Sequence, residues 1–356
     1  MSAKVTPEQT DESIGKVRMG VFLSGWIDPS VPKPSTYIAN LFDRIPAARA
    51  AGMSSVWVGQ HLLGHPWPVM DTSVYLGRLA AEIGDMEMGG VYLLPLAHPI
   101  RLAESLVTLD NISGGKFIVA PALGWRPAEF EAMGVPINER AARFSESLKI
   151  MKMLWYSDEP VSYEGRFYKL DKVQMVAKPE RPGGIPIWIG ASSVPAVQRA
   201  ARFGDSWLGS SHSPFVTLQE LSGAYSAELT VQGKLPKRRP LLRHCMVADT
   251  DKQAEERFTE AFTAYYKALG NWGIFKEVIG EQHASGDGEL PPGRAIVGSP
   301  KTAIAQLKRY MELGFNEFIF QVGLPGTPEP YVRESMEMMG KEVLPYLQGA
   351  KVDLKV

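Results

Sequence analysis

The chain has 356 residues, of which 45% are hydrophobic and 22% are charged, a balance typical of a globular protein with a packed core. Its formal net charge of −1 argues against a nucleic acid or an anionic membrane as a partner, because such partners select a basic surface. The single cysteine, Cys245, excludes an internal disulfide and a cysteine metal cluster, and it is consistent with a cytoplasmic protein.

The first 15 residues are polar and acidic and lack the apolar stretch of a signal peptide or a membrane anchor. We expect them to form a flexible tail, followed by one domain over residues 16–356. No apolar run approaches the roughly 20 residues that a membrane helix needs, so no membrane contact is expected.

Apolar runs alternate along the chain with segments of helical periodicity. Strands are predicted at 18–23, 55–59, 86–94, 116–120, 185–189, 206–209, 241–247 and 317–322. Helices are predicted from a cap at Ser35 or Thr36 to 51, from a cap at Asp71 or Thr72 to 83, and at 99–112, 138–155, 194–203, 251–270, 301–313 and 330–346. Residues 271–294 are rich in glycine and are predicted to be irregular.

Strands that alternate with helices imply a parallel sheet. Residues 161–176 differ, because they alternate in polarity and carry the turn signal Glu164-Gly165, so they are predicted to form a hairpin outside that sheet. The strand count reaches eight only if this hairpin is set aside. Periodicity alone therefore leaves a closed barrel and an open doubly wound sheet as alternatives.

The most informative stretch begins at the end of the strand at 86–94, which Pro95 terminates. It reads L-P-L-A-H-P-I-R-L-A-E over residues 94–104 and L-D-N-I-S-G-G-K-F over residues 109–117, and Gly124 follows on the exit of the next strand. In this pattern the chain resembles the bacterial luciferase-like monooxygenase family. The resemblance implies an α/β fold of the (β/α)8 TIM-barrel type with insertions, and it decides between the two alternatives.

The resemblance also implies a flavin or deazaflavin cofactor. The main expectation is a two-component monooxygenase that takes reduced FMN from a partner flavin reductase and uses O2 to oxidise a small organic substrate. Two alternatives stay open: a coenzyme F420-dependent oxidoreductase that transfers hydride, and a flavin-binding relative that has lost catalysis. Family members commonly pair through barrel helices, so a homodimer or homotetramer is expected.

His61 is the candidate catalytic residue. In a (β/α)8 barrel the active site forms at the carboxyl ends of the strands, and His61 directly follows the strand at 55–59. Histidine suits acid–base work because its ordinary pKa lies near working pH. The family commonly has an acid before this histidine, whereas this chain has Gln60, which weakens the case for proton transfer and keeps a structural role as the alternative.

Small residues at 190–193 precede a predicted helix, and a helix start favours a phosphate. The resemblance places the cofactor phosphate there and near residues 124–125, with residues 90–91 behind the flavin ring. No arginine lies in the 190–193 turn, so backbone dipoles are expected to neutralise the phosphate unless Arg126 reaches it. The predicted cofactor residues are Gly90, Val91, Gly124, Trp125, Gly190, Ala191, Ser192 and Ser193.

Other side chains are candidates for the substrate pocket: Trp26, Trp67 and Tyr92 as walls and His212 as a substrate contact. His98 is interpreted as structural because it opens a helix. The motifs GxGxxG, GxxxxGK[ST] and HExxH are absent, so neither a Rossmann dinucleotide site, a P-loop nor a dedicated metal site is expected.

Overall fold

The structure is a computed structural model. It describes residues 15–24, 26–27, 31, 33–65, 67–235, 238–270, 272, 293–348, 350 and 352.

Within these residues, eight parallel strands form a barrel in the order β4-β3-β2-β1-β11-β9-β8-β7. Val119 in β4 pairs with Ile187, just before β7, and its N–H donates to the Pro186 carbonyl at 3.0 Å, which joins the two ends of this order. The strands are β1 (Arg18–Leu23), β2 (Ser55–Gly59), β3 (Glu87–Leu93), β4 (Phe117–Ala122), β7 (Trp188–Ala191), β8 (Ser206–Gly209), β9 (Pro240–Val247) and β11 (Glu317–Val322). The predicted (β/α)8 barrel is thus confirmed.

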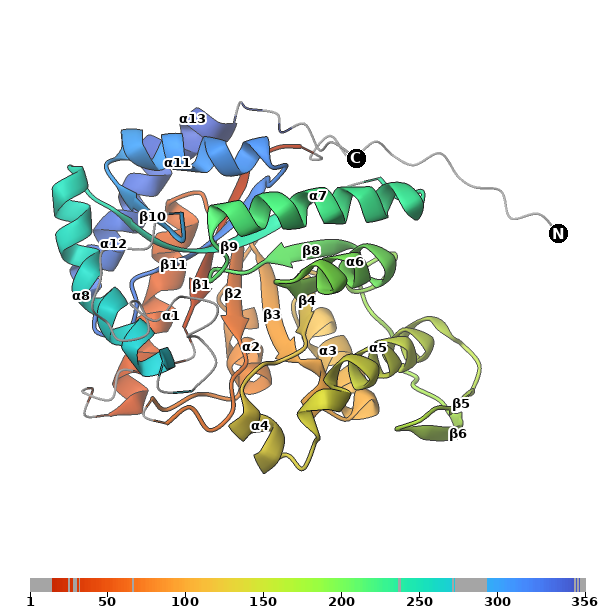
Figure 1. Ribbon diagram of the computed structural model, residues 1–356. Coiled ribbons are helices and arrows are strands. Elements are labelled where there is room, and N and C mark those ends of the chain that lie inside the picture. The colour runs from red at the N-terminus through yellow and green to blue at the C-terminus, as the bar shows by residue number, and fades with distance from the viewer. Residues whose placement is uncertain are drawn as a thin grey trace.

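Helices surround the barrel, and a two-stranded hairpin of β5 (Val161–Glu164) and β6 (Lys169–Val173) projects from it (Figure 1). A short strand, β10 (Ala295–Gly298), pairs with β9. The helices are α1 (Pro34–Ala50), α2 (Thr72–Ala80), α3 (Pro99–Ile112), α4 (Pro127–Ala132), α5 (Arg140–Tyr156), α6 (Val194–Phe203), α7 (Phe215–Val231), α8 (Asp251–Gly270), α11 (Pro300–Glu312), α12 (Glu329–Met338) and α13 (Leu344–Gln348), with short 3-10 turns at Leu94–Leu96 and Ile137–Glu139 and a π turn at Met339–Val343. No described helix is long and apolar enough to cross a bilayer.

Several boundaries differ from the sequence prediction for identifiable reasons. Helix α1 begins at Pro34 after Lys33 rather than at a Ser35 or Thr36 cap, because proline is already in the helical φ range at a first position. The Asp71 cap of α2 is confirmed, since its side chain accepts from the Val74 N–H at 2.9 Å. The predicted helix 330–346 is interrupted by the π turn. Helices α4 and α7 and strand β10 were not predicted, while most of 271–294 lies outside the described residues.

A packed core fills the barrel interior. Trp57 in β2 is fully buried and stacks on Trp188 in β7, with ring centroids 5.1 Å apart. At Gly89 in β3, an added Cβ would lie 2.1 Å from the Trp57 ring, so this inward position requires glycine. Because these side chains block the barrel axis, a binding site has room only beyond them, at a strand end.

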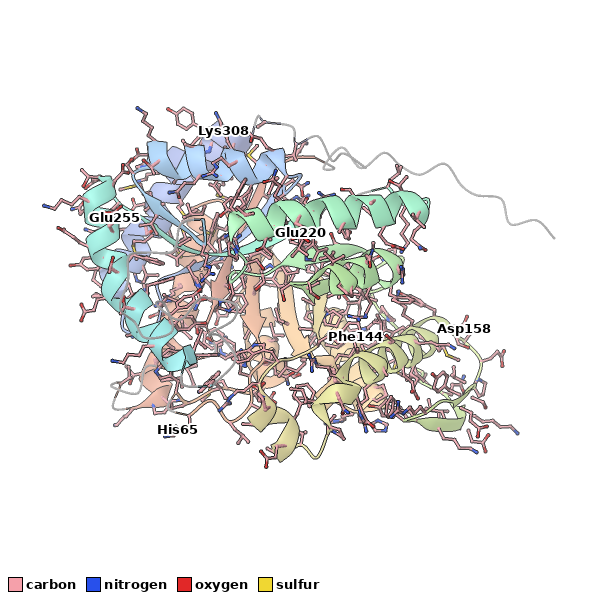
Figure 2. All side chains as sticks on the ribbon, viewed as in Figure 1. His65, Phe144, Asp158, Glu220, Glu255 and Lys308 are labelled. Atoms are coloured by element: carbon pink, nitrogen blue, oxygen red, sulfur yellow. The ribbon has the colours of Figure 1, made fainter. Side chains whose placement is uncertain are left out.

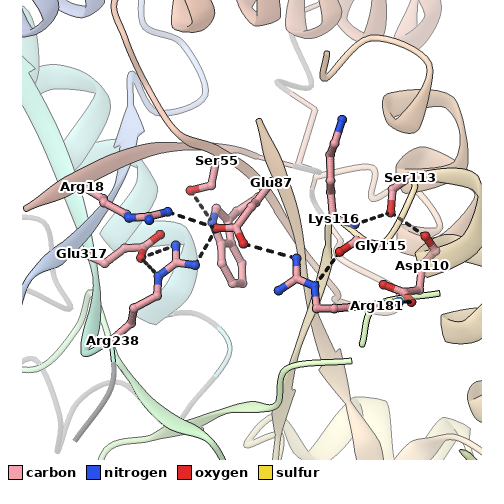
Figure 3. Close-up of polar contacts among 11 residues, drawn as sticks. Arg18, Ser55, Glu87, Asp110, Ser113, Gly115, Lys116, Arg181, Arg238 and Glu317 are labelled. Atoms are coloured by element: carbon pink, nitrogen blue, oxygen red, sulfur yellow. Dashed lines mark hydrogen bonds and ion pairs between the residues drawn. The ribbon is translucent and has the colours of Figure 1, made fainter. Parts of the chain in front are cut away.

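The amino end of the barrel is closed by ion pairs, and we call this region the closed end. Glu87 at the start of β3 receives Arg238 at 2.6 Å, Arg181 at 3.3 Å and Arg18 at 3.8 Å, and Arg238 also binds Glu317 of β11 (Figure 3). The Glu317 side chain is fully buried. Each of these two carboxylates is therefore paired with at least one arginine.

Candidate active site

A cavity of about 370 Å³ lies at the opposite end, where the strands finish, and we call this region the mouth. Its volume falls within the range of about 300–1,000 Å³ that is usual for small-molecule sites. In Figure 1 strands β2 and β3 point towards the end of the barrel that carries α4, and Figure 2 shows His65 on that same side. The lining includes Ser24, Gln60, His61, Val91, Leu123, Gly124, Trp125, Arg140, Gly190, Ala191, Ser192, Ser193, Ser210, Ser211, His212, Tyr265 and Gln321.

His61 lies in this lining with a carboxyl partner that is distant in sequence. Its Nδ1 is 3.0 Å from Oε1 of Glu129 in α4, and the same oxygen accepts the Leu62 N–H at 2.9 Å. The Glu129 side chain is completely buried. With Nδ1–H donated to Glu129, the other ring nitrogen, Nε2, is left as the acceptor.

Gln60 has a different task. Its Oε1 accepts the Leu93 N–H at 2.8 Å, which ties the end of β2 to the end of β3. Gln60 therefore joins two strand ends, and the carboxyl group that contacts His61 belongs to Glu129.

Arg126 holds the same loop and does not line the cavity. Its Nη1 donates to the carbonyls of Leu62 at 2.8 Å and Leu63 at 2.7 Å, and its guanidinium lies 3.9 Å from the Trp272 ring centroid. Burial lowers the Arg126 pKa from its ordinary value. Because Arg126 and Glu129 are three residues apart on one helical turn, they fix the His61 loop together.

An aromatic wall surrounds His61. The Trp26 ring meets the His61 ring edge-on at 4.9 Å, with Trp125 and Trp272 at 6.0 and 5.8 Å. Trp26 in turn packs on Tyr265 at 5.4 Å, and both line the cavity. Such flat apolar surfaces suit an aromatic ring system.

The predicted phosphate turn also lies at the mouth. Gly190–Ser193 lead from β7 into α6 and line the cavity together with Gly124 and Trp125. Gly124 has φ of +73°, a left-handed conformation that glycine adopts without strain. Arg140, at the start of α5, lines the same cavity and supplies a cation that was not predicted.

His212, after β8, lines the cavity and begins a buried hydrogen-bonded chain. Its Nδ1 lies 3.1 Å from the Tyr266 hydroxyl, which lies 3.3 Å from Nε2 of His244. Burial, then the positive charge of Arg243, lowers the His244 pKa to about 3. Burial and then His244, Arg294, His61 and Arg243 also lower the His212 pKa. Both rings are neutral at pH 7.

Three predicted residues do not line the cavity. Side chains alternate along a strand, so Val91 faces inward while Gly90 and Tyr92 face outward. Tyr92 packs in the layer between β3 and α2, with its hydroxyl 3.1 Å from that of Ser73, so the prediction that it walls the pocket is wrong. An added Cβ on Gly90 would lie 2.7 Å from Leu76, which explains this glycine by packing. Trp67 stacks on Tyr265 at 5.3 Å, behind Trp26.

Sequence reasoning missed Glu129, Arg140 and Tyr265. Helix α4, which carries Glu129, has only six residues, and so short a segment gives no readable periodicity. In the part of the chain that the structure describes, no three His, Cys, Asp or Glu side chains are grouped so as to hold a metal ion.

The chain matches the model of the luciferase-like monooxygenase family over residues 17–317, and it belongs to that family. It is 25% identical over 325 residues to the oxygenase component of flavin-dependent trigonelline monooxygenase from Acinetobacter baylyi, covering 86% of this chain and 89% of the relative. It is 26% identical over 336 residues to an F420-dependent glucose-6-phosphate dehydrogenase from Amycolatopsis mediterranei, covering 85% and 92%.

Among solved structures, monooxygenase RslO1 from Streptomyces bottropensis aligns with a TM-score of 0.80 at 22% identity, over 92% of this chain and 99% of that one. This likeness shows the shared fold. The relatives' names place the chain in a family of oxidoreductases that use either a flavin or F420.

Proposed function

We propose that the protein is an FMN-dependent monooxygenase that acts with O2 on a small organic substrate and receives reduced FMN from a separate flavin reductase. The observation that carries the proposal is the His61–Glu129 pair, with 3.0 Å between Nδ1 and Oε1, at the edge of the aromatic cavity. The name of the trigonelline relative, an oxygenase component, supports the two-component arrangement.

The residues at the mouth fit a flavin with one phosphate. Trp26 and Trp125 offer apolar faces, while Val91 and the small residues Gly190 and Ala191 leave room for a ring system. The α6 start at Ser192–Ser193 and the guanidinium of Arg140 would hold the phosphate. Bound reduced flavin would supply the electrons that activate O2.

The chain's own groups have three tasks in this reaction. Glu129 fixes the tautomer and the direction of the His61 ring by accepting from Nδ1, so that Nε2 takes or returns a proton. Arg126 anchors the loop carbonyls of Leu62 and Leu63. The tryptophans keep water from the reacting atoms, which strengthens polar interactions inside the cavity.

An F420-dependent hydride transfer is the second candidate, and the Amycolatopsis relative favours it. F420 carries an oligoglutamate tail that would select several cations at the mouth, whereas Arg140 is the one Lys or Arg among the described lining residues. This difference favours FMN. A flavin-binding protein without catalysis is the third candidate; in it, the His61–Glu129 pair would only hold the loop in place.

The test is to titrate the apo-protein separately with FMN and F420 and to compare the dissociation constants. We expect FMN to bind more tightly, and reductase-supplied FMN to support oxygen-dependent turnover. Tighter binding of F420, with hydride transfer that needs no oxygen, would reject the proposal in favour of the second candidate. Binding of FMN without any turnover would favour the third.

A further inference from the structure

The ionisable side chains of the cavity wall share one electrostatic property. They are His61, His212, Arg140 and Tyr265, and no aspartate or glutamate is among the described lining residues. Glu129 contacts His61 without being a lining residue, and its Oε1 is shared between the His61 ring and the Leu62 N–H. Positive charge or hydrogen-bond donors favour an anion at two places on this wall, and the phosphate turn with Arg140 is the first.

The second place is the loop Ser210–His212, because a buried cation lies behind it. Arg243 of β9 is completely buried, and its Nη1 donates to the Ser210 carbonyl at 2.7 Å while Nη2 donates to the Ser213 carbonyl at 3.0 Å. It also lies over the Tyr310 ring at 4.8 Å. None of the described carboxylates pairs with it. These neutral partners satisfy hydrogen bonds and leave the charge uncompensated, which is costly in a buried position.

Neighbouring groups do not cancel this charge. The Tyr266 hydroxyl and the rings of His212 and His244 form a hydrogen-bonded chain next to Arg243. Burial lowers the pKa of both histidines, so the chain is neutral at pH 7 and can offer donors but no negative charge. Arg294, another nearby arginine, adds to the positive potential at His212.

This loop also lies close to the reacting region of the proposed enzyme. Ring contacts run from His61 through Trp26 at 4.9 Å and Tyr265 at 5.4 Å. They continue through Tyr266 at 5.5 Å to His212 at 5.8 Å. Because His61 and the Ser210–His212 loop line the same cavity of about 370 Å³, a small molecule there can face His61 with one part and the loop with another.

We propose that Ser210, Ser211 and His212, backed by the buried guanidinium of Arg243, form a subsite for an oxyanion of the substrate, a carboxylate or a phosphate. The inference rests on the proposed function, and it narrows the substrate class to anionic molecules. An oxyanion there accepts hydrogen bonds from the serine hydroxyls and the His212 ring and places a negative charge near Arg243. The cofactor phosphate is the other possible source of an oxyanion, so the test separates the two.

The experiment measures binding of benzoate and of benzamide, a neutral probe of similar shape, to the full chain with and without FMN by calorimetry. We expect benzoate to bind about tenfold more tightly, the size of one charge-assisted hydrogen bond. In Ser211→Ala and His212→Asn, benzoate binding should weaken about tenfold while benzamide binding stays the same. The matched control Ser73→Ala, whose hydroxyl lies 3.1 Å from that of Tyr92 outside the cavity, should leave benzoate affinity unchanged.

A third variant, Arg243→Met, tests the buried charge and should abolish the preference for benzoate if it folds. If Arg243→Met does not fold, the variants Ser211→Ala and His212→Asn still provide the test. Equal binding of the two probes, no benzoate binding at its highest soluble concentration, or equal loss of both in the variants would overturn the proposal.

A further measurement compares the affinities of FMN and riboflavin for the wild type and the variants. If Ser211→Ala and His212→Asn weaken FMN but not riboflavin, the subsite holds the cofactor phosphate and the substrate assignment is wrong. Benzoate binding is also measured without FMN. If the protein proves not to use FMN, these titrations therefore still show whether the subsite binds an anion.

Discussion

The two ends of the barrel treat charge in opposite ways. At the closed end, Glu87 and the buried Glu317 are each paired with arginine (Figure 3). At the mouth, Arg243 is completely buried against backbone carbonyls and the Tyr310 ring, and the described cavity wall contains no carboxylate. The closed end pairs its charged side chains with one another, whereas the mouth has a buried positive charge that a bound anion could pair with.

The difference separates stability from function within one fold. Removing one partner of a buried pair strands the other charge, so substitutions at the closed end should act on the free energy of unfolding. Groups at the mouth act on a bound molecule, so substitutions there should act on turnover or affinity. This division follows the general behaviour of (β/α)8 barrels.

The largest effect is expected for His61→Ala at the mouth. Turnover should fall by about 10²–10⁴-fold while FMN affinity is kept, because a group that acts mainly in the transition state contributes little to ground-state binding. The measurement is a reductase-coupled assay with an anionic substrate found through the probe titrations, together with FMN titration.

Glu129→Gln is the companion variant, since it keeps the shape and an acceptor oxygen but removes the charge beside His61. It should lower turnover by less than His61→Ala does. Near-full turnover in both variants would make the His61–Glu129 pair structural.

At the closed end, Arg238→Met should lower the free energy of unfolding by about 3–5 kcal/mol, because it leaves Glu317 buried without its cation. Urea unfolding measures this value, and FMN affinity should be unchanged. As a control, Arg78→Met breaks an exposed pair with Glu82 and should cost less than about 1 kcal/mol. An equal loss in the two variants would contradict the assigned role of the closed end.

The mouth should also make the protein acid-sensitive. His244 has a pKa of about 3 in the folded chain and about 6.5 when unfolded, so the unfolded state binds more protons as the pH falls. Stability from this group is fully present above about pH 6.5 and is lost progressively towards pH 3. Between pH 7 and 5 the loss should be about 2 kcal/mol.

The variant His244→Gln should remove this part of the pH dependence, whatever it does to stability at pH 7. Unfolding in urea at both pH values gives the comparison. The same change with pH in the wild type and the variant would assign the acid sensitivity to other groups.

The smallest effect is expected at the phosphate turn. Ser192→Asp should weaken FMN binding about tenfold by like-charge repulsion, and riboflavin, which has no phosphate, should bind unchanged. An unchanged FMN dissociation constant at low salt would place the phosphate elsewhere.

The sequence by itself determined the alternation of strands and helices, the hairpin outside the barrel and the family. Strands β1, β2, β8 and β11 and helices α3, α6 and α8 have their predicted bounds, because their apolar spacing and end signals are local. The motif that carries the family resemblance is also local: its second part, residues 109–117, leads into β4 at the closed end, whereas Gly124 lines the mouth. The Ser113 hydroxyl donates to the Asp110 carbonyl (Figure 3). The fully buried Asp110 side chain accepts the backbone N–H groups of Glu180 and Arg181.

Only the tertiary structure decided how the site is completed. Glu129 reaches His61 across 68 positions of sequence, and Tyr92 turns outward because strand register sets which side chains face the barrel axis. The uncompensated charge of Arg243 is likewise invisible in a chain with 38 basic and 39 acidic residues. Local signals in a sequence report which element forms, whereas partners and burial arise when distant elements meet.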